Sequence, residues 1–303
     1  MSTVPGREEA PVIVDAHVHA WDRWPYDAAV PDPATRGSAA ALLHEMDAAG
    51  VERALVVCAA IGGEDPRTAN PANNADVARA VAAHPDRLTA LVDVDSRWSG
   101  TYHRPGAADR LERVLAETGA SGVSHYLADE VDGWFEEPEG RAFLARAAAA
   151  GVPLSLHARP AWFAALGRAL RAVPGLVVLL HHQGHVVPGS PTYERDLVAL
   201  TDLAAVPGVA VKVSGFHYLA DRPWAYPYPE THAVLHALLA AFGTHRLLWG
   251  SDFPVSRPHV TYRQSLELVR ELTGGDADVL GGTALRLVEP ARRPIIPARP
   301  DNG

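Results

Sequence analysis

Short apolar runs rich in β-branched residues recur along this 303-residue chain, and they constrain its fold more than any other feature. There are eight of them, at 12–15, 53–59, 88–94, 122–126, 152–157, 176–181, 209–214 and 247–251. The runs are continuously apolar rather than alternating, which is typical of parallel strands covered on both faces. Each is therefore predicted to be a buried strand.

The intervals between these runs have the periodicity of amphipathic helices. The clearest examples are 39–49, 74–84, 107–117, 141–150 and 231–242. Glycine follows two of these stretches, at Gly50 and Gly151, where a helix commonly ends in a left-handed residue. A doubly wound open sheet has the same local units, but eight strand–helix units in one chain of this length favour closure. We predict a single-domain α/β protein, a (β/α)8 TIM-like barrel.

The barrel is expected over 12–290, between an N-terminal extension, 1–11, and a proline-rich tail, 291–303. With 27 basic and 36 acidic side chains the net charge is −9, the wrong sign for binding nucleic acid or an anionic membrane. Cys58 is the only cysteine, and we find neither a signal peptide nor a membrane span. The expectation is a cytoplasmic protein whose partner is a small molecule. Assembly into a homo-oligomer is left open.

Histidines gather where the predicted strands end, which in an α/β barrel is where the active site is built. His17 and His19 close the first run, and His125, His157, His181 and His182 follow later runs, while Asp252 follows the last. Residues two apart on a strand share a face, with Cα atoms about 6.5 to 7 Å apart. The His17 and His19 imidazoles are thus expected to converge. They can hold a cation such as zinc, or simply hydrogen-bond to the backbone.

Several motifs together resemble the amidohydrolase superfamily. They are Ile13-Val-Asp-Ala-His-Val-His-Ala-Trp21, Pro153-Leu-Ser-Leu-His157, His182-Gln-Gly, Val211-Lys-Val-Ser-Gly215 and Leu247-Leu-Trp-Gly-Ser-Asp-Phe-Pro254. Within the superfamily the chain is most similar to the amidohydrolase-2 lactonases, which include 2-pyrone-4,6-dicarboxylate lactonase and sugar-lactone hydrolases. The likeness covers about 12–287. An H-x-H motif at one end of the barrel sequence and W-G-S-D-x-P at the other make it specific.

The resemblance implies a set of site residues. His17, His19, His157 and Asp252 would surround one divalent metal, with zinc the best candidate, or the vacated site of a metal-independent enzyme. Asp252 and His182 would be the catalytic residues. Binuclear relatives bridge two ions with a carbamylated lysine after the fourth strand, and this chain has none there. Its only lysine, Lys212, is expected inside the barrel or beside a carboxylate.

The chain also departs from the family pattern at substrate-binding positions. His181 replaces the usual aspartate, His125 stands where relatives with acidic substrates have arginine, and His217-Tyr218 replaces a tyrosine followed by arginine. We assign substrate binding to a set spread over several loops: Trp21, His125, Arg159, His217 and Tyr218. Without arginines at the two family positions, the pocket should prefer a neutral or singly charged substrate, unless Arg97 or Arg159 supplies a substitute. Aromatic residues Trp21, Trp24, Tyr26 and Trp98 either wall the mouth or pack in the loops.

The expected reaction is hydrolysis of a lactone or a related carbonyl compound. Asp252 would accept a proton from water, the histidines or a metal would stabilise the oxyanion, and His182 would protonate the leaving oxygen. One alternative is a metal-dependent non-oxidative decarboxylase on the same barrel. Another is a barrel that binds without catalysis. No G-x-S-x-G or nucleotide-binding glycine motif occurs, so serine-hydrolase chemistry and a nucleotide cofactor are disfavoured.

Overall fold

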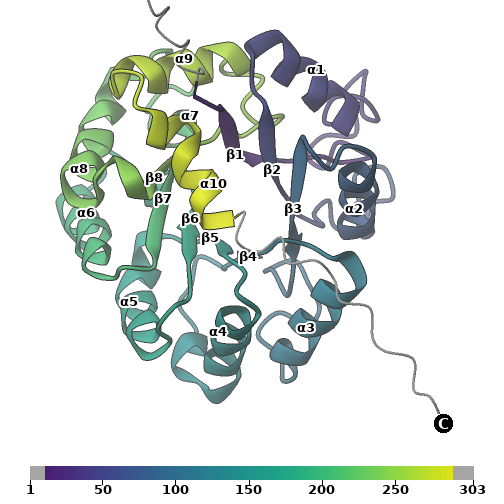
Figure 1. The fold of residues 1–303 in the computed structure, drawn as a ribbon, viewed down its shortest axis with the longest axis vertical. Coiled ribbons are helices and arrows are strands. Elements are labelled where there is room, and N and C mark those ends of the chain that lie inside the picture. The colour runs from purple at the N-terminus through teal and green to yellow at the C-terminus, as the bar shows by residue number, and fades with distance from the viewer. Residues whose placement is uncertain (1–10, 289–303) are drawn as a thin grey trace, which may run out of the picture.

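The computed structural model describes residues 11–288, which form an eight-stranded parallel sheet in the order β1 to β8 (Figure 1). The strands are β1 Val14–Val18, β2 Arg53–Val57, β3 Leu88–Asp93, β4 Gly122–Tyr126, β5 Leu154–His157, β6 Val178–Leu180, β7 Val209–Val213 and β8 Leu247–Trp249. Helices alternate with the strands and surround them. The predicted (β/α)8 barrel is confirmed, and each strand overlaps the apolar run from which it was predicted.

Hydrogen bonds from the segment after β8 bring the last strand against the first. The Asp252 amide donates to the His17 carbonyl at 2.8 Å, and the His19 amide donates to the Phe253 carbonyl at 2.7 Å. Gly250 is required at this seam, because an added Cβ would lie 2.6 Å from Cβ of His17. The seam therefore holds the residues of both terminal motifs side by side.

A bulge in β1 directs its histidines. Between Asp15 and Val18 the register against β2 shifts by one residue, so β1 carries an extra residue there. Bulges of this kind re-aim side chains and are common beside active sites. Here Asp15 accepts hydrogen bonds from the amides of His17 and Ser251, while His17 and His19 both turn towards Asp252.

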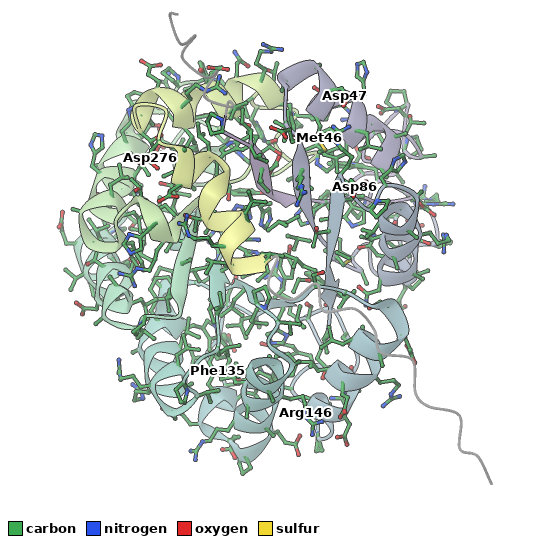
Figure 2. The ribbon with its side chains drawn as sticks, viewed as in Figure 1. Met46, Asp47, Asp86, Phe135, Arg146 and Asp276 are labelled. Atoms are coloured by element: carbon green, nitrogen blue, oxygen red, sulfur yellow. The ribbon has the colours of Figure 1, made fainter. Side chains whose placement is uncertain are left out.

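The helices form the outer layer of the molecule. They are α1 Ala39–Ala49, α2 Asn73–Ala83, α3 Ala107–Thr118, α4 Pro138–Ala150, α5 Phe163–Ala172, α6 Tyr193–Asp202, α7 Phe216–Leu219, α8 His232–Phe242, α9 Tyr262–Leu272 and α10 Thr283–Val288. Gly50 and Gly151 end α1 and α4 in the left-handed conformation, as predicted. Met46 and Phe135, labelled in Figure 2, are fully buried in the apolar layer between strands and helices.

The helix α10 lies across the amino-terminal end of the barrel (Figure 1). Its Ala284 and Val288 pack with Val14 and Leu55 in the apolar cluster that fills the barrel interior. Within the described residues, side chains thus fill this end of the barrel, and the site is expected at the carboxyl ends of the strands. The proposed extension and tail fall almost wholly outside the described residues. Within 11–288 no helix is long and apolar enough to span a membrane.

Candidate active site

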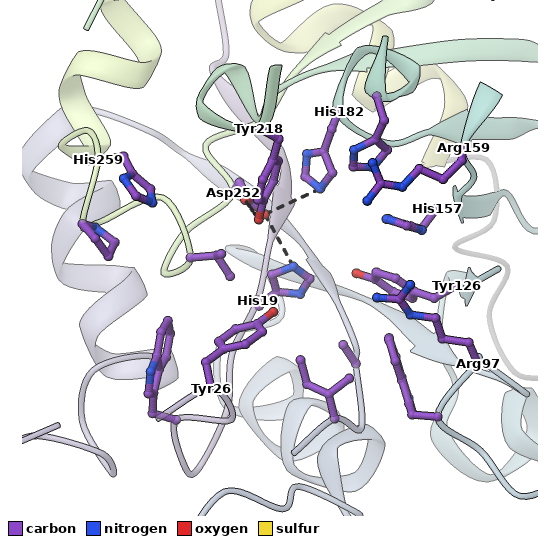
Figure 3. Close-up of a pocket in the computed structure, with 17 residues that line it drawn as sticks. His19, Tyr26, Arg97, Tyr126, His157, Arg159, His182, Tyr218, Asp252 and His259 are labelled. Carbon is purple, nitrogen blue, oxygen red and sulfur yellow. Dashed lines mark hydrogen bonds and ion pairs between the residues drawn. The ribbon is translucent and has the colours of Figure 1, made fainter. Parts of the chain in front are cut away.

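A cavity of about 690 Å³ opens at the carboxyl ends of the strands (Figure 3). Its wall comes from the segments that follow the strands, and it combines titratable groups with aromatic rings. The lining residues are His19, Trp24, Tyr26, Ala59, Ile61, Arg97, Trp98, Tyr126, His157, Arg159, His182, His185, Tyr218, Asp252, Val255, Pro258 and His259. The cavity thus lies where the sequence predicted the site, at the carboxyl ends of the strands.

Asp252 lies at the floor of this cavity, fully buried, in the left-handed backbone conformation at φ 58°. Its Oδ2 accepts a hydrogen bond of 2.8 Å from the Tyr218 hydroxyl. Imidazole Nε2 atoms surround the carboxylate: His17 at 3.5 Å, His19 at 3.6 Å and His182 at 3.9 Å from Oδ1, and His217 at 3.8 Å from Oδ2. One carboxylate thus faces four imidazoles and a phenol.

The histidines are oriented by their other ring nitrogens. Nδ1 of His19 donates to the Val57 carbonyl at 2.7 Å, and its Nε2 faces Asp252. Nδ1 of His182 pairs with the Ser214 hydroxyl at 2.9 Å. Gly215 has φ 66°, and an added Cβ would lie 2.7 Å from that same Nδ1. A glycine after Ser214 is therefore needed to leave room for the ring of His182.

Lys212 is completely buried beneath the histidines, inside the barrel as predicted. Its Nζ lies 3.2 Å from Nδ1 of His17 and donates to the Ser155 hydroxyl at 2.6 Å. Ser155 is in turn 2.7 Å from Nε2 of His181. Burial lowers the pKa of Lys212 to about 7, against the opposing effect of Asp15 and Asp252. A polar layer therefore separates the site from the apolar base of the barrel.

Burial lowers the pKa of three histidines at the cavity, His157, His182 and His217. It lowers the pKa of His157 to about 3, helped by the positive charges of Arg97 and Arg159. It lowers the pKa of His217 to about 4, although Asp252 acts in the opposite direction. The pKa of His182 is held well below its usual range by burial and by neighbouring histidines. The rings therefore act as hydrogen-bonding groups rather than as a cluster of positive charges.

Three of the four expected metal ligands come together. Two tetrahedral ligands about 2.0 to 2.1 Å from zinc lie about 3.3 to 3.4 Å from each other, close to the separations of His17 and His19 from Asp252. Nε2 of His17 and Oδ1 of Asp252 are buried without a hydrogen-bond partner, which is expected of atoms that bind a cation. The donor set fits one divalent ion.

His157 is not part of that set. Among the described residues, the donor groups that lie within 4.8 Å of one another are His17, His19 and Asp252, and His17, His181 and His182. The ring of His157 instead lies 5.2 Å from that of Tyr126, stacked on the cavity wall. The ligand set expected from sequence therefore differs from the observed grouping. A metal held by Nε2 of His17 would require the ring proton on Nδ1, so that Nδ1 would donate to Lys212 Nζ rather than accept from it.

His125 lies outside the cavity, contrary to the expectation that it binds substrate. In β4 the residue directed inward is Tyr126, which pairs in register with His157, so its neighbour His125 points outward. Nδ1 of His125 bonds to the Val94 carbonyl at 2.8 Å, and its ring packs on Trp134 and Phe143. We correct its assignment to a buried residue of the outer layer.

The other expected binding residues are distributed around the site. Tyr218 and Arg159 line the cavity. His217 is not in the lining; it contacts Asp252, and its ring lies 4.0 Å from the ring of Tyr218. Trp21 is buried and stacks on His19 at 4.7 Å, so it supports a site residue instead of forming the wall.

Tyr126, His185 and His259 line the cavity but were not assigned from sequence. Tyr126 pairs in register with His157 of the neighbouring strand, and aligning the ends of the two predicted strands would have identified it. His185 follows His182 in a turn in which both have positive φ, a geometry with no simple sequence signal. His259 belongs to the segment between β8 and α9, and its ring lies 4.9 Å from that of His217.

Residues 14–289 match the family model Amidohydro_2, described as amidohydrolase. The chain belongs to this family. A curated relative from Burkholderia ambifaria, named L-fucono-1,5-lactonase, is 29% identical over 253 residues, which cover 80% of this chain and 81% of the relative. The resemblance to lactonases of this family is thereby confirmed at the family level, and the protein is a hydrolase.

Solved structures share the fold at lower identity. A probable 2-pyrone-4,6-dicarboxylic acid hydrolase from Acinetobacter baumannii, with citric acid bound, has a TM-score of 0.71 at 20% identity, covering 91% of this chain and 99% of its own. An amidohydrolase from Burkholderia multivorans with bound zinc has a TM-score of 0.72 at 22% identity, covering 92% and 99%. These two likenesses establish the barrel fold of this family member.

Proposed function

We propose that this amidohydrolase opens a lactone by hydrolysis, with Asp252 as the base that activates water. The observation that carries the proposal is the buried Asp252 carboxylate at the cavity floor, facing neutral imidazoles and the Tyr218 hydroxyl. The relative named as an L-fucono-1,5-lactonase supports the same reaction class.

Asp252 accepts a proton as the oxygen of water bonds to the lactone carbonyl carbon. The one N–H of neutral His182 lies on Nε2 when Nδ1 accepts from the Ser214 hydroxyl, and it stabilises the charge that develops on oxygen. The bond from that carbon to the ring oxygen then breaks, and the proton held by Asp252 passes to the leaving alkoxide. His182 hydrogen-bonds to that leaving oxygen. The product is a hydroxy acid.

His17, His19 and Asp252 would hold a divalent ion, and their nitrogen and oxygen donors make zinc the best match. When bound there, such an ion would lower the pKa of water to about 7 and polarise the substrate carbonyl. The zinc found in the Burkholderia multivorans amidohydrolase supports this assignment. Within this chain the ion would compete with Lys212 for the orientation of His17.

A panel of five- and six-membered lactones tests the function, with acid release followed by a pH indicator. Hydrolysis of at least one lactone, abolished in Asp252→Asn, is the expected result. In a separate assay, aromatic and unsaturated carboxylic acids are incubated with the enzyme, and the release of carbon dioxide is measured. Carbon dioxide formation without lactone opening would contradict the proposal and favour the decarboxylase alternative.

A further inference from the structure

Two arginines from separate loops meet on one side of the cavity. Arg97 follows β3, Arg159 follows β5, and the carboxylate of Asp129, which follows β4, lies between them. Nη1 of Arg97 is 3.7 Å and Nε of Arg159 is 3.4 Å from the same oxygen, Oδ1 of Asp129. Because β3, β4 and β5 are neighbours in the sheet, their following loops are adjacent, and this brings the three side chains together.

The guanidinium groups are held in place but retain free donors. The Arg97 amide donates to the Tyr126 carbonyl at 2.9 Å, which fixes its backbone at the cavity wall. Among the described residues, neither guanidinium makes a hydrogen bond to a protein acceptor, and the partner of both is the Asp129 carboxylate. Arg110, by contrast, donates to both oxygens of Asp95 and to three carbonyls. Arg97 and Arg159 can therefore turn their planar forks towards a ligand.

The charges at this side leave one positive charge over. Two arginines and one aspartate sum to +1, and neutral His157 and His185 add nothing to it. Figure 3 shows Arg97 and Arg159 on the far side of the cavity from Asp252, with His157 and Tyr126 beside them. A ligand that presents its ester to Asp252 has its other end near the two guanidinium groups. One planar carboxylate matches both the surplus charge and the fork geometry, whereas a phosphate monoester carries close to two negative charges at pH 7.

We propose that Arg97 and Arg159 form a subsite for a single carboxylate, so that the substrate is a lactone carrying one carboxylate remote from the ester that is cleaved. This inference rests on the proposed lactonase function and names its substrate class. Trp98, whose ring lies 4.6 Å from that of Tyr126, provides an aromatic wall for the ring that joins the two ends. The subsite replaces, from other loops, the arginines missing after β4 and after Ser214.

The first test compares three lactones with the same ring, bearing no, one or two carboxylates. For wild type, kcat/KM should be at least about 10-fold higher with one carboxylate than with none, and a second carboxylate should bring no further gain. In Arg97→Gln and in Arg159→Gln, the ratio of kcat/KM for the singly charged lactone to kcat/KM for the neutral lactone should fall towards one. Arg222→Gln is the matched control, because this exposed arginine lies in the loop after β7 and outside the cavity lining. It should retain the wild-type ratio.

Binding without turnover separates the subsite from the proposed reaction. Tetrahydropyran-2-carboxylate and its uncharged carboxamide are titrated into wild type and into the double variant Arg97→Gln/Arg159→Gln by calorimetry. The carboxylate should bind at least about 10-fold more tightly than the amide to wild type alone. Equal binding of the two to wild type would overturn the subsite, even if lactones are hydrolysed. Selective carboxylate binding without hydrolysis of any lactone would contradict the proposed function and retain the subsite. Unchanged melting temperatures check that the variants are folded.

Discussion

The two sides of the cavity differ in how their side chains are held. On the side built by β1, β6, β7 and β8, Asp252 and the histidines around it are almost fully buried, and hydrogen bonds to the Val57 carbonyl and the Ser214 hydroxyl orient His19 and His182. On the side built after β3, β4 and β5, Arg97 and Arg159 have side chains 42% and 45% exposed and pair only with Asp129. The proposed reaction chemistry thus lies on the buried side, and the proposed recognition on the more exposed loops.

This comparison predicts the largest effect at Asp252. Asp252→Asn keeps the shape of the side chain but cannot accept a proton from water, so kcat on a confirmed lactone should fall about 100-fold or more. The measurement is steady-state hydrolysis, with circular dichroism to check the fold. A loss below about fivefold would remove Asp252 from the role of base and undo the assignment of chemistry to this side.

A smaller effect is expected at His182. In His182→Asn the hydrogen bond to Ser214 can be kept, but the ring nitrogen beside Asp252 is lost, so kcat should fall about 10-fold. KM should change little if the residue acts on the leaving oxygen. A rise in KM with kcat preserved would instead place His182 with the binding residues of the opposite wall.

Metal content distinguishes the two histidines of the H-x-H motif. In wild type, Nδ1 of His19 is bound to the Val57 carbonyl, while Nδ1 of His17 faces Lys212. Elemental analysis should therefore show a greater loss of zinc in His19→Ala than in His17→Ala, after equal dialysis against zinc. Equal zinc in wild type and both variants would mean that these residues are a hydrogen-bonding cluster and not a metal site.

Sequence alone predicted the strand side of the cavity well, because position along a parallel strand determines where its last residue lies. His17, His19, His182 and Asp252 were expected together, and the structure brings them together. His125 was misplaced because the strand ends were read without the two-residue alternation that directs Tyr126 inward.

The loop side could not be predicted in the same way. Asp129, the residue that joins the two arginines, has no motif around it, and the conformations of the three loops depend on packing between neighbours. Arg97 and Arg159 were recognised only as alternatives for binding an anion. Their pairing through one carboxylate is a property of the folded chain.

His125 provides the smallest expected effect and a control for buried histidines outside the cavity. Burial lowers its pKa from the ordinary histidine value of about 6.5 to about 4, with the Val94 hydrogen bond acting in the opposite direction. The unfolded chain therefore binds a proton between pH 6.5 and about 4 that the folded protein does not. Stability should be lost as pH falls through this range and be retained above it.

Because of this one group, the free energy of unfolding should be about 2 kcal/mol lower at pH 5 than at pH 7. His125→Asn removes the titration, while the other buried groups are common to both proteins and cancel in the difference. Urea unfolding at pH 7 and pH 5 should therefore show a free energy of unfolding that falls by about 2 kcal/mol less in the variant than in wild type. His236→Asn, at an exposed position on α8, should follow wild type. If His125→Asn also follows wild type, the neutral state of His125 has been wrongly attributed to burial. Burial could then not be used to explain the difference in pKa between His125 and an exposed histidine.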